Sequence, residues 1–193
     1  EKLTAAGIIA DTTSARARSA YALLAAGDTS GVFQLASEGM ARLCRDVRPS
    51  CHADISDILA LYRPGPMSAG MHLHYAARRH GVEPVEYGLY TERADEAAVI
   101  ASVLGDTMGL CVYQEQLQRL AVVVADFTAA QSNELQKAFS KKIREKMDQL
   151  EAVWQAGGQA ATRRDGSAKV AFEAATLSRL WATFKGSADY LFN

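Results

Sequence analysis

The stretch from residue 109 to 142 constrains the fold most, because it contains two consecutive helix patterns of different character. The first follows a polar group at residues 114–116 and carries apolar residues at the spacing of one buried helix face: Leu117, Leu120, Ala121 and Val124. Phe127 and Thr128 interrupt it, and Thr128 is placed to cap a second helix. The stretch therefore predicts a buried helix joined by a short turn to a second one.

The second helix pattern ends in positive charge. Lys137, Lys141 and Arg144 are spaced so that one continuous helix would present them on one face, and Lys142 follows directly. A buried helix would then hold a cationic helix in a fixed place. Such an arrangement suits the binding of polyanions.

The rest of the chain also has helical patterns, so we predict a mainly α fold with a few short extended segments. Clear strand alternation is almost absent. The expected helices are residues 14–26, 37–48, 54–62, 70–80, roughly 93–104, 143–154 and 169–184. The expected non-helical segments are an extended piece at 32–35, a rigid proline corner at 63–67, an acidic loop at 82–97, a stop at Gly157-Gly158 and a polar loop at 159–168.

Composition excludes several classes of protein. The 193 residues carry a net charge of −1, so attraction to nucleic acid must come from local patches. Three cysteines without a C-x-x-C pair argue against a disulfide scaffold or zinc ribbon and favour a reducing cytoplasm. No signal peptide and no membrane-spanning apolar run is visible, and both ends are expected to be cut from a longer protein.

Two arginine groups outside the opening stretch have alternative explanations. Arg42, Arg45 and Arg48 recur at three-residue steps, which fits either a solvated helix face or phosphate contact. Arg78, Arg79 and His80 precede Gly81 at an expected helix end, where cations stabilise the negative end of the helix dipole.

Signatures of catalysis are missing from the sequence. There is no phosphate-binding P-loop, nucleophile elbow or H-E-x-x-H motif, and no Asp-x-Asp pair for two metals. His72-x-His74 would point to different sides of a helix, so no metal site is expected there. From the residues alone, the chain is a helical module with a cationic face.

Six blocks, in order, resemble the bacterial replicative DNA polymerase III alpha subunits, the C-family polymerases, and their actinobacterial type in particular. The blocks are GDTSGVFQLASEGM (27–40), ALYRPGPMSAGM (60–71), ARRHG (77–81), GLCVYQEQLQRLA (109–121), ELQKAFSKK (134–142) and ADYLFN (188–193). In that family these blocks belong to the fingers domain. The resemblance implies a helical lead-in from the palm side at residues 1–31 and a fingers domain at 32–193 that is truncated at its C-terminal end.

The resemblance also implies a function for the longer protein. A DNA-directed DNA polymerase would use these residues to bind incoming dNTP and template-primer DNA, and would act with a sliding clamp and other replisome subunits in the cytoplasm, without a membrane. Mg²⁺ would be held by palm aspartates, which this sequence lacks. The fragment alone is therefore expected to be inactive and to bind no metal.

The resemblance to the family also implies roles for individual residues of this sequence. The resemblance assigns nucleotide binding to Gln136, Lys137, Lys141, Lys142 and Asn193. Gln136 departs from the family, which has Arg there, and so lacks a bidentate phosphate contact.

Ser140 likewise replaces a glycine of the family pattern, and Asn193 is the last residue of an element whose Lys, Ser and His lie beyond the sequence. The resemblance assigns DNA binding to Arg63, Arg78, Arg79 and His80.

Three hypotheses follow from the sequence. The chain is the fingers module of a working polymerase, or part of a non-catalytic or inhibitor-tolerant homologue that binds DNA or a ligand. The third hypothesis is an unrelated helical scaffold whose lysines are only solvated.

Overall fold

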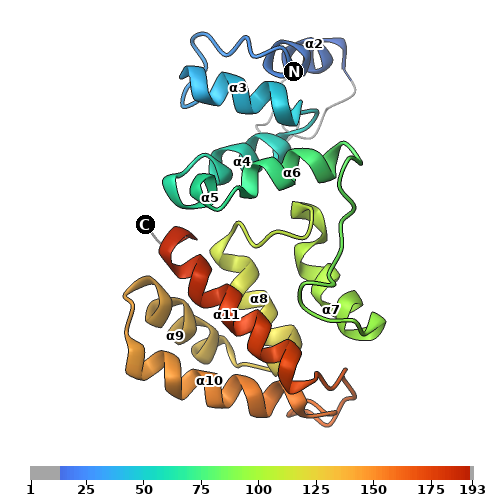
Figure 1. Cartoon of the computed structure of the whole chain (residues 1–193), viewed down its shortest axis with the longest axis vertical. Coiled ribbons are helices and arrows are strands. Elements are labelled where there is room, and N and C mark those ends of the chain that lie inside the picture. The colour runs from blue at the N-terminus through green and yellow to red at the C-terminus, as the bar shows by residue number, and fades with distance from the viewer. Residues whose placement is uncertain (1–13, 192–193) are drawn as a thin grey trace, which may run out of the picture. The chain divides into compact units, whose positions relative to one another are not determined.

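Helices form the regular secondary structure of this protein. The computed structural model describes residues 14–191, with side chains described as far as residue 186. Within that range there are ten α-helices, one 3₁₀ turn and no strand, only an isolated bridge between Thr162 and Ala168. The predicted mainly α fold is confirmed (Figure 1).

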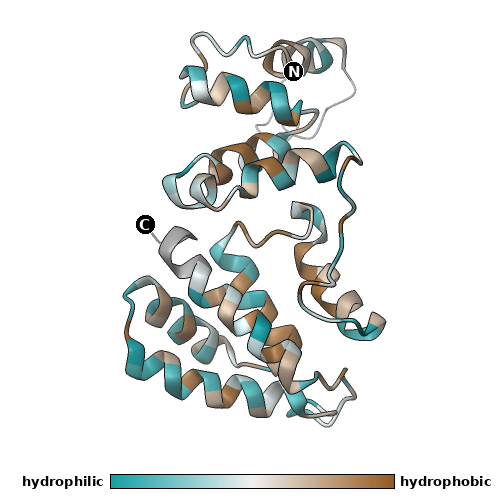
Figure 2. Ribbon diagram, viewed as in Figure 1, coloured by the Kyte–Doolittle hydropathy of each residue, from teal (hydrophilic) through white to brown (hydrophobic). Residues whose placement is uncertain are grey.

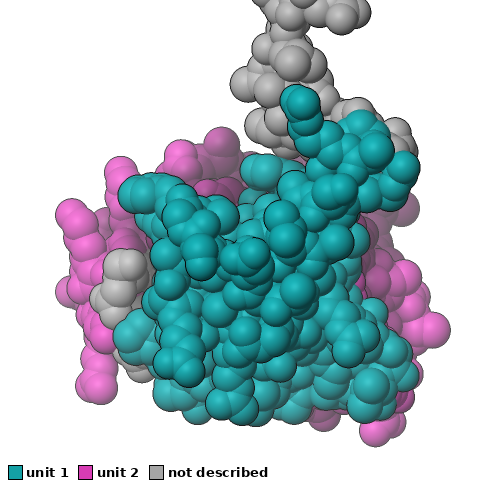
Figure 3. Space-filling view, turned by 90° about the horizontal axis from the view of Figure 1, so that it is seen from above, with its two compact units in different colours: residues 1–83 teal, residues 84–193 magenta. Residues whose placement is uncertain are grey.

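The chain divides into two compact units, residues 1–83 and residues 84–193, which Figure 3 draws in different colours. The predicted division into a lead-in at 1–31 and a fingers domain at 32–193 stays a prediction.

The described part of unit 1, from residue 14 on, contains five short helices. They are α2 (Ala15–Ala25), α3 (Glu38–Val47), α4 (His52–Leu61), α5 (Pro64–Ser68) and α6 (Met71–Arg79). Ser14 and Ser37 cap α2 and α3 as predicted, since each hydroxyl accepts a hydrogen bond from a backbone N–H three residues later. Gly27 ends the first helix in the left-handed conformation, with φ of 79°.

A buried polar pair lies inside unit 1. The Tyr75 hydroxyl of α6 donates to the Asp57 carboxylate of α4 at 2.6 Å, and Tyr75 is 1% exposed. Burial, with the bond to Asp57, raises the pKa of Tyr75. The bond therefore fixes α6 against α4 at one register.

The predicted non-helical corner at 63–67 is wrong. Residues 64–68 form helix α5, with Pro64 at its first position and Pro66 within its first turn. Proline is tolerated there because first-turn N–H groups have no partner within the helix. The two prolines thus start a helix instead of preventing one.

Unit 2 contains five longer helices around one core. They are α7 (Ala94–Leu104), α8 (Gln114–Ala125), α9 (Ala129–Ser140), α10 (Arg144–Gln159) and α11 (Ala174–Leu191), with a 3₁₀ turn at Gly105–Thr107 after α7. Figure 2 shows α10 alternating hydrophobic and hydrophilic patches, as expected for a helix with one buried face. The helix pair predicted from residues 109–142 is confirmed, since α8 buries Leu117, Leu120, Ala121 and Val124 and Thr128 caps α9.

Aromatic rings form the centre of unit 2. Trp154 of α10 lies 6.0 Å from Trp181 and 5.2 Å from Phe184 of α11, between ring centroids. Phe139 of α9 meets Trp181 edge to face at 5.4 Å. Phe127, between α8 and α9, approaches Trp154 at 6.5 Å. The rings therefore join α9, α10 and α11 directly.

Two further local predictions are wrong. Residues 32–35 are turns, with Gln34 at φ of 62°, and not an extended segment. Gly157 and Gly158 do not stop α10, which continues to Gln159. These glycines allow close packing: a Cβ on Gly158 would lie 2.4 Å from a Leu177 methyl, and one on Gly157 would lie 2.2 Å from the Ala125 carbonyl oxygen.

We expect Gly158→Ala to lower the free energy of unfolding by about 1–3 kcal/mol, the usual effect of overpacking a core. Gly105→Ala is the matched control. Gly105 is exposed and has ordinary helical angles, and its new Cβ would meet only the Tyr87 hydroxyl at 3.9 Å. It should raise stability by about 0.4–1 kcal/mol. Urea unfolding measures both, and equal effects would contradict the packing role of Gly158.

Candidate nucleotide and DNA site

Three exposed lysines, Lys137, Lys141 and Lys142, gather where α9 ends. The Lys141 N–H donates to the Lys137 carbonyl at 3.0 Å, and the Ile143 N–H reaches back to Ala138 at 2.9 Å. Lys142 is left-handed, with φ of 52°. These bonds close the helix in the manner of a C-terminal capping motif.

The predicted single cationic face is therefore wrong in one respect. Arg144 begins α10 after the turn, so it does not continue the face of α9. The reversal is needed because Phe139 and Trp154 must both enter the same core, and a continuous helix would separate them. Lys137 remains in the last turn of α9, and Lys141 and Lys142 belong to the turn itself.

Burial fixes the position of the lysine-bearing turn. Leu135, Ala138 and Phe139 on the inner side of α9 are all fully buried. They alternate with the exposed residues along the helix, so packing of the inner side sets where the lysines lie. The turn is thus attached to the aromatic core through Phe139.

Local charge around the turn is partly neutralised by one acid. Glu134 of α9 pairs with Lys146 of α10 at 2.6 Å, and this bond lowers the pKa of Glu134. Cations at a helix C-terminus also stabilise the helix dipole, which gives Lys137 a structural role without any ligand. An anion bound there would meet lysines already concentrated by the fold.

Gln136 lies in a network of side-chain amides between α8 and α9. Its Nε2 donates to Gln114 at 2.5 Å, and Gln118 donates to its Oε1 at 3.0 Å. Gln118 also donates to Asn133 at 3.1 Å. Local sequence patterns do not indicate that Gln114, Gln118 and Asn133 meet Gln136, because this contact depends on how α8 packs against α9.

The polar start of α8 has a structural explanation. Gln116 is buried and accepts from the backbone N–H groups of Val112 and Tyr113, at 2.8 and 3.0 Å. Its Nε2 donates to the Thr107 hydroxyl at 2.7 Å. Gln116 therefore ties the apolar segment before α8 to the turn after α7.

Of the four residues assigned to DNA binding, three are engaged inside unit 1. Arg79 pairs with the buried Asp54 carboxylate at 2.5 Å, and Arg78 pairs with Glu83 at 2.7 Å. His80 contacts the Asp46 carbonyl oxygen at 3.0 Å through its Nε2. Arg63 precedes α5 and is exposed, so it alone of the four presents its side chain to solvent without a described partner.

Asn193 lies outside the described residues. The other residues assigned to nucleotide binding lie in unit 2, and the four residues assigned to DNA binding lie in unit 1.

The donors of a magnesium site are not gathered in the part of the chain that the structure describes. No group of three or more His, Cys, Asp or Glu side chains there could hold a metal ion. His74 is instead hydrogen-bonded to Glu83 at 2.8 Å, and that bond, with the one from Arg78, lowers the pKa of Glu83. The residues described do not fit Mg²⁺.

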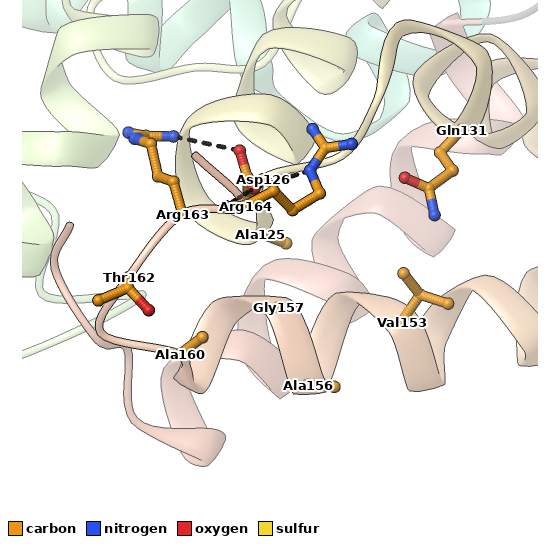
Figure 4. A pocket seen from close by; sticks show the side chains of 10 residues that line it. All are labelled: Ala125, Asp126, Gln131, Val153, Ala156, Gly157, Ala160, Thr162, Arg163 and Arg164. Atoms are coloured by element: carbon orange, nitrogen blue, oxygen red, sulfur yellow. Dashed lines mark hydrogen bonds and ion pairs between the residues drawn. The ribbon is translucent and has the colours of Figure 1, made fainter. Parts of the chain in front are cut away.

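A cavity of about 400 Å³ lies at the C-terminal ends of α8 and α10, away from the residues assigned by sequence. Asp126 reaches Arg164 at 2.9 Å and Arg163 at 3.7 Å along its edge (Figure 4). The bond from Arg164 holds the pKa of Asp126 below its usual value. Alanine and glycine contribute to the lining, and Asp126 offsets the charge of one of the two arginines.

In the part of the chain that the structure describes, the architecture is a helical domain in which a lysine-bearing turn is attached to an aromatic core. Residues 2–162 match the family model described as "Bacterial DNA polymerase III alpha subunit finger domain". The chain belongs to this family.

Relatives named "DNA polymerase III subunit alpha" are similar along most of the chain. The protein from Saccharopolyspora erythraea is 39% identical and the one from Aquifex aeolicus 35% identical, each over 173 residues. That from Mycobacterium tuberculosis is 36% identical over 176 residues. These alignments cover 90–91% of this chain but only 13–14% of the relatives.

Hydropathy gives one further finding. Among the residues that the structure describes, no helix combines the length and the apolar character needed to cross a bilayer.

We expect Arg79→Gln to destabilise unit 1 by about 1–3 kcal/mol, because it leaves a buried carboxylate short of one charged partner. Arg63→Gln, at an exposed position, should change stability by less than about 0.5 kcal/mol. Thermal unfolding of the two variants tests this difference. Equal melting temperatures would contradict the structural role of Arg79.

Proposed function

We propose that this chain acts as the fingers module of a bacterial replicative polymerase, where it contributes to binding of incoming dNTP and of template-primer DNA. The observation that supports the proposal most is the turn after α9, where three exposed lysines lie within six residues on a fixed support. Ammonium groups held in this way suit the oxygens of a triphosphate.

The residue groups have separate binding roles in this module. Lys137, Lys141 and Lys142 attract and orient the triphosphate, and Asn193 is part of the same assignment. Arg63 is the best-placed of the four DNA residues, since Arg78, Arg79 and His80 hold unit 1 together. Within the described residues nothing is assigned to bond making, so the module binds and positions and does not itself react.

The longer protein that we propose is a DNA-directed DNA polymerase. Its catalytic aspartates and Mg²⁺ would belong to a palm domain, and it would work in the cytoplasm with a sliding clamp and other replisome subunits. The support for this is similarity to relatives named as DNA polymerase III subunit alpha, of whose length the chain covers about one eighth.

A second candidate function rests on Gln136. Arginine at this position would offer a bidentate contact to phosphate, whereas the Gln136 amide is bonded to Gln114 and Gln118. A non-catalytic or inhibitor-tolerant homologue with weakened nucleotide affinity fits this replacement. It would still bind DNA or another ligand.

We expect the double variant Lys141→Gln, Lys142→Gln to weaken dATP binding by the whole chain about thirtyfold, because each of the two lysines removed is a charged phosphate partner worth roughly 1 kcal/mol. NMR titration at low salt measures the affinity. Lys185→Gln is the control, since Lys185 is an exposed lysine of the same unit that pairs with Glu151 at 2.9 Å. Equal loss in the control, or no loss in the double variant, would reject a triphosphate site at the turn.

Gln136→Arg should tighten dATP binding by about 1–3 kcal/mol, the range for a hydrogen bond to a charged group. Gln155→Arg adds the same charge on α10 and controls for net charge. An unchanged affinity for Gln136→Arg would show that position 136 does not touch the triphosphate, and would remove the reason for the second candidate.

A further inference from the structure

The loop between α2 and α3 holds an aromatic side chain in water. Phe33 is 88% exposed, the most exposed of the large hydrophobic residues described. Its neighbour Val32 is 39% exposed. Packing within this unit does not explain a phenyl ring at this position, because an exposed ring contributes almost nothing to the hydrophobic core.

The loop around Phe33 is an ordered support. Thr29 and Leu35 are 3% and 2% exposed, so both sides of the loop are buried in unit 1. The Val32 N–H donates to Thr29 and the Leu35 N–H donates to Val32, both at 3.1 Å. Phe33 therefore lies within two consecutive hydrogen-bonded turns whose ends are buried. Figure 1 shows the loop between α2 and α3 to which it belongs.

Backbone conformation adds a second observation. Gly31 and Gln34 on either side of Phe33 are left-handed, with φ of 75° and 62°. Glycine adopts this conformation freely, but glutamine does so at a conformational cost. The chain thus accepts strain at Gln34 in a loop that turns Phe33 outward, and such strain is typical of ligand-binding segments.

Positive charge lies next to the loop. Arg42, Arg45 and Arg48 of α3 and its cap are all exposed, and none of them has an ion pair among the described residues. Arg45 lies across Gly27, where the loop begins, since a Cβ on Gly27 would be 2.9 Å from the Arg45 Cγ. The acids of this region are Asp28, Glu38 and Asp46, against Arg16, Arg18, Arg42, Arg45 and Arg48 over residues 14–48.

We propose that Phe33 is a stacking platform for an unpaired base of single-stranded DNA, with Arg42 and Arg45 of the following helix, α3, as contacts to the DNA backbone. Stacking of bases on exposed aromatic rings, combined with positive side chains that follow the backbone of the strand, is the way in which proteins hold single strands without reading their sequence. The bases of a duplex are already stacked and offer no free face to a ring, so the ligand is a single strand. This inference rests on the proposed function and adds a template-side contact in unit 1.

The test uses the whole chain and a 12-nucleotide single strand carrying 2-aminopurine, whose fluorescence falls when the base stacks. Phe33→Ala should weaken binding about tenfold and abolish the fluorescence change, as expected for loss of one stacked base. Phe33→Trp should preserve both. Val32→Ala is the matched control and should change neither.

Salt dependence tests the arginines separately. Arg42→Gln should lower the slope of log affinity against log salt by about 0.7 and leave the fluorescence change intact. Wild-type binding and fluorescence in Phe33→Ala would overturn the proposal. Self-association of the wild type that Phe33→Ala abolishes would also overturn it, since the ring would then serve a protein contact.

Failure of this inference can be distinguished from failure of the proposed function. The Lys141→Gln, Lys142→Gln variant should retain the 2-aminopurine change while losing dATP affinity. If dATP binding survives in that variant but Phe33→Ala loses stacking, the triphosphate site is rejected and the stacking platform stands. If the Lys141→Gln, Lys142→Gln variant loses dATP affinity while Phe33→Ala retains the 2-aminopurine fluorescence change, only the stacking platform is rejected.

Discussion

The packing of Phe139 against Trp181, within the aromatic cluster of unit 2, is the interaction on which the proposed nucleotide site depends. Phe139 is fully buried, two residues after Lys137 and two before Lys141. Trp154 and Phe184 complete the cluster from α10 and α11. Since aromatic rings bury large areas in specific edge-to-face geometries, they fix α9 more closely than aliphatic contacts would. Because Ala138 and Phe139 between them are buried in the core, the lysines are left on the solvent side of the helix end.

Charge in this protein divides into groups that stabilise the fold and groups that face solvent. Arg79 satisfies the buried Asp54 carboxylate, which also accepts from the Ser50 and Cys51 N–H groups. Breaking such a pair leaves an uncompensated buried charge, so its arginine is poorly suited to exchange partners with DNA. Arg63 and the α3 arginines have no such role in the described residues and are available to a ligand. Burial thus distinguishes the arginines of unit 1 that stabilise the fold from those that we propose as ligand contacts.

Local signals in the sequence predicted most helices well. Ser14, Ser37 and Thr128 are confirmed as helix caps, because a hydroxyl that accepts a backbone N–H is a short-range interaction. The same local rules failed at Pro64 and at Gly157. Proline was compatible with a first helical turn, and glycine was needed where α10 passes close to Ala125. In both cases the outcome depended on the position of the residue in its helix or on the residue that it contacts, and not on the residue type alone.

The sequence by itself determined the helical class, the family and the cluster of lysines near residue 140, since periodicity and ordered motifs are properties of the chain. Only the tertiary structure decided that Arg144 leaves the lysine face and that Gln136 joins an amide network with Gln114. It also decided that Arg79 is held by Asp54 and that Phe33 is exposed. The physical reason is that the burial of a side chain and the identity of its interaction partners depend on segments distant in sequence. Local sequence patterns do not encode these contacts.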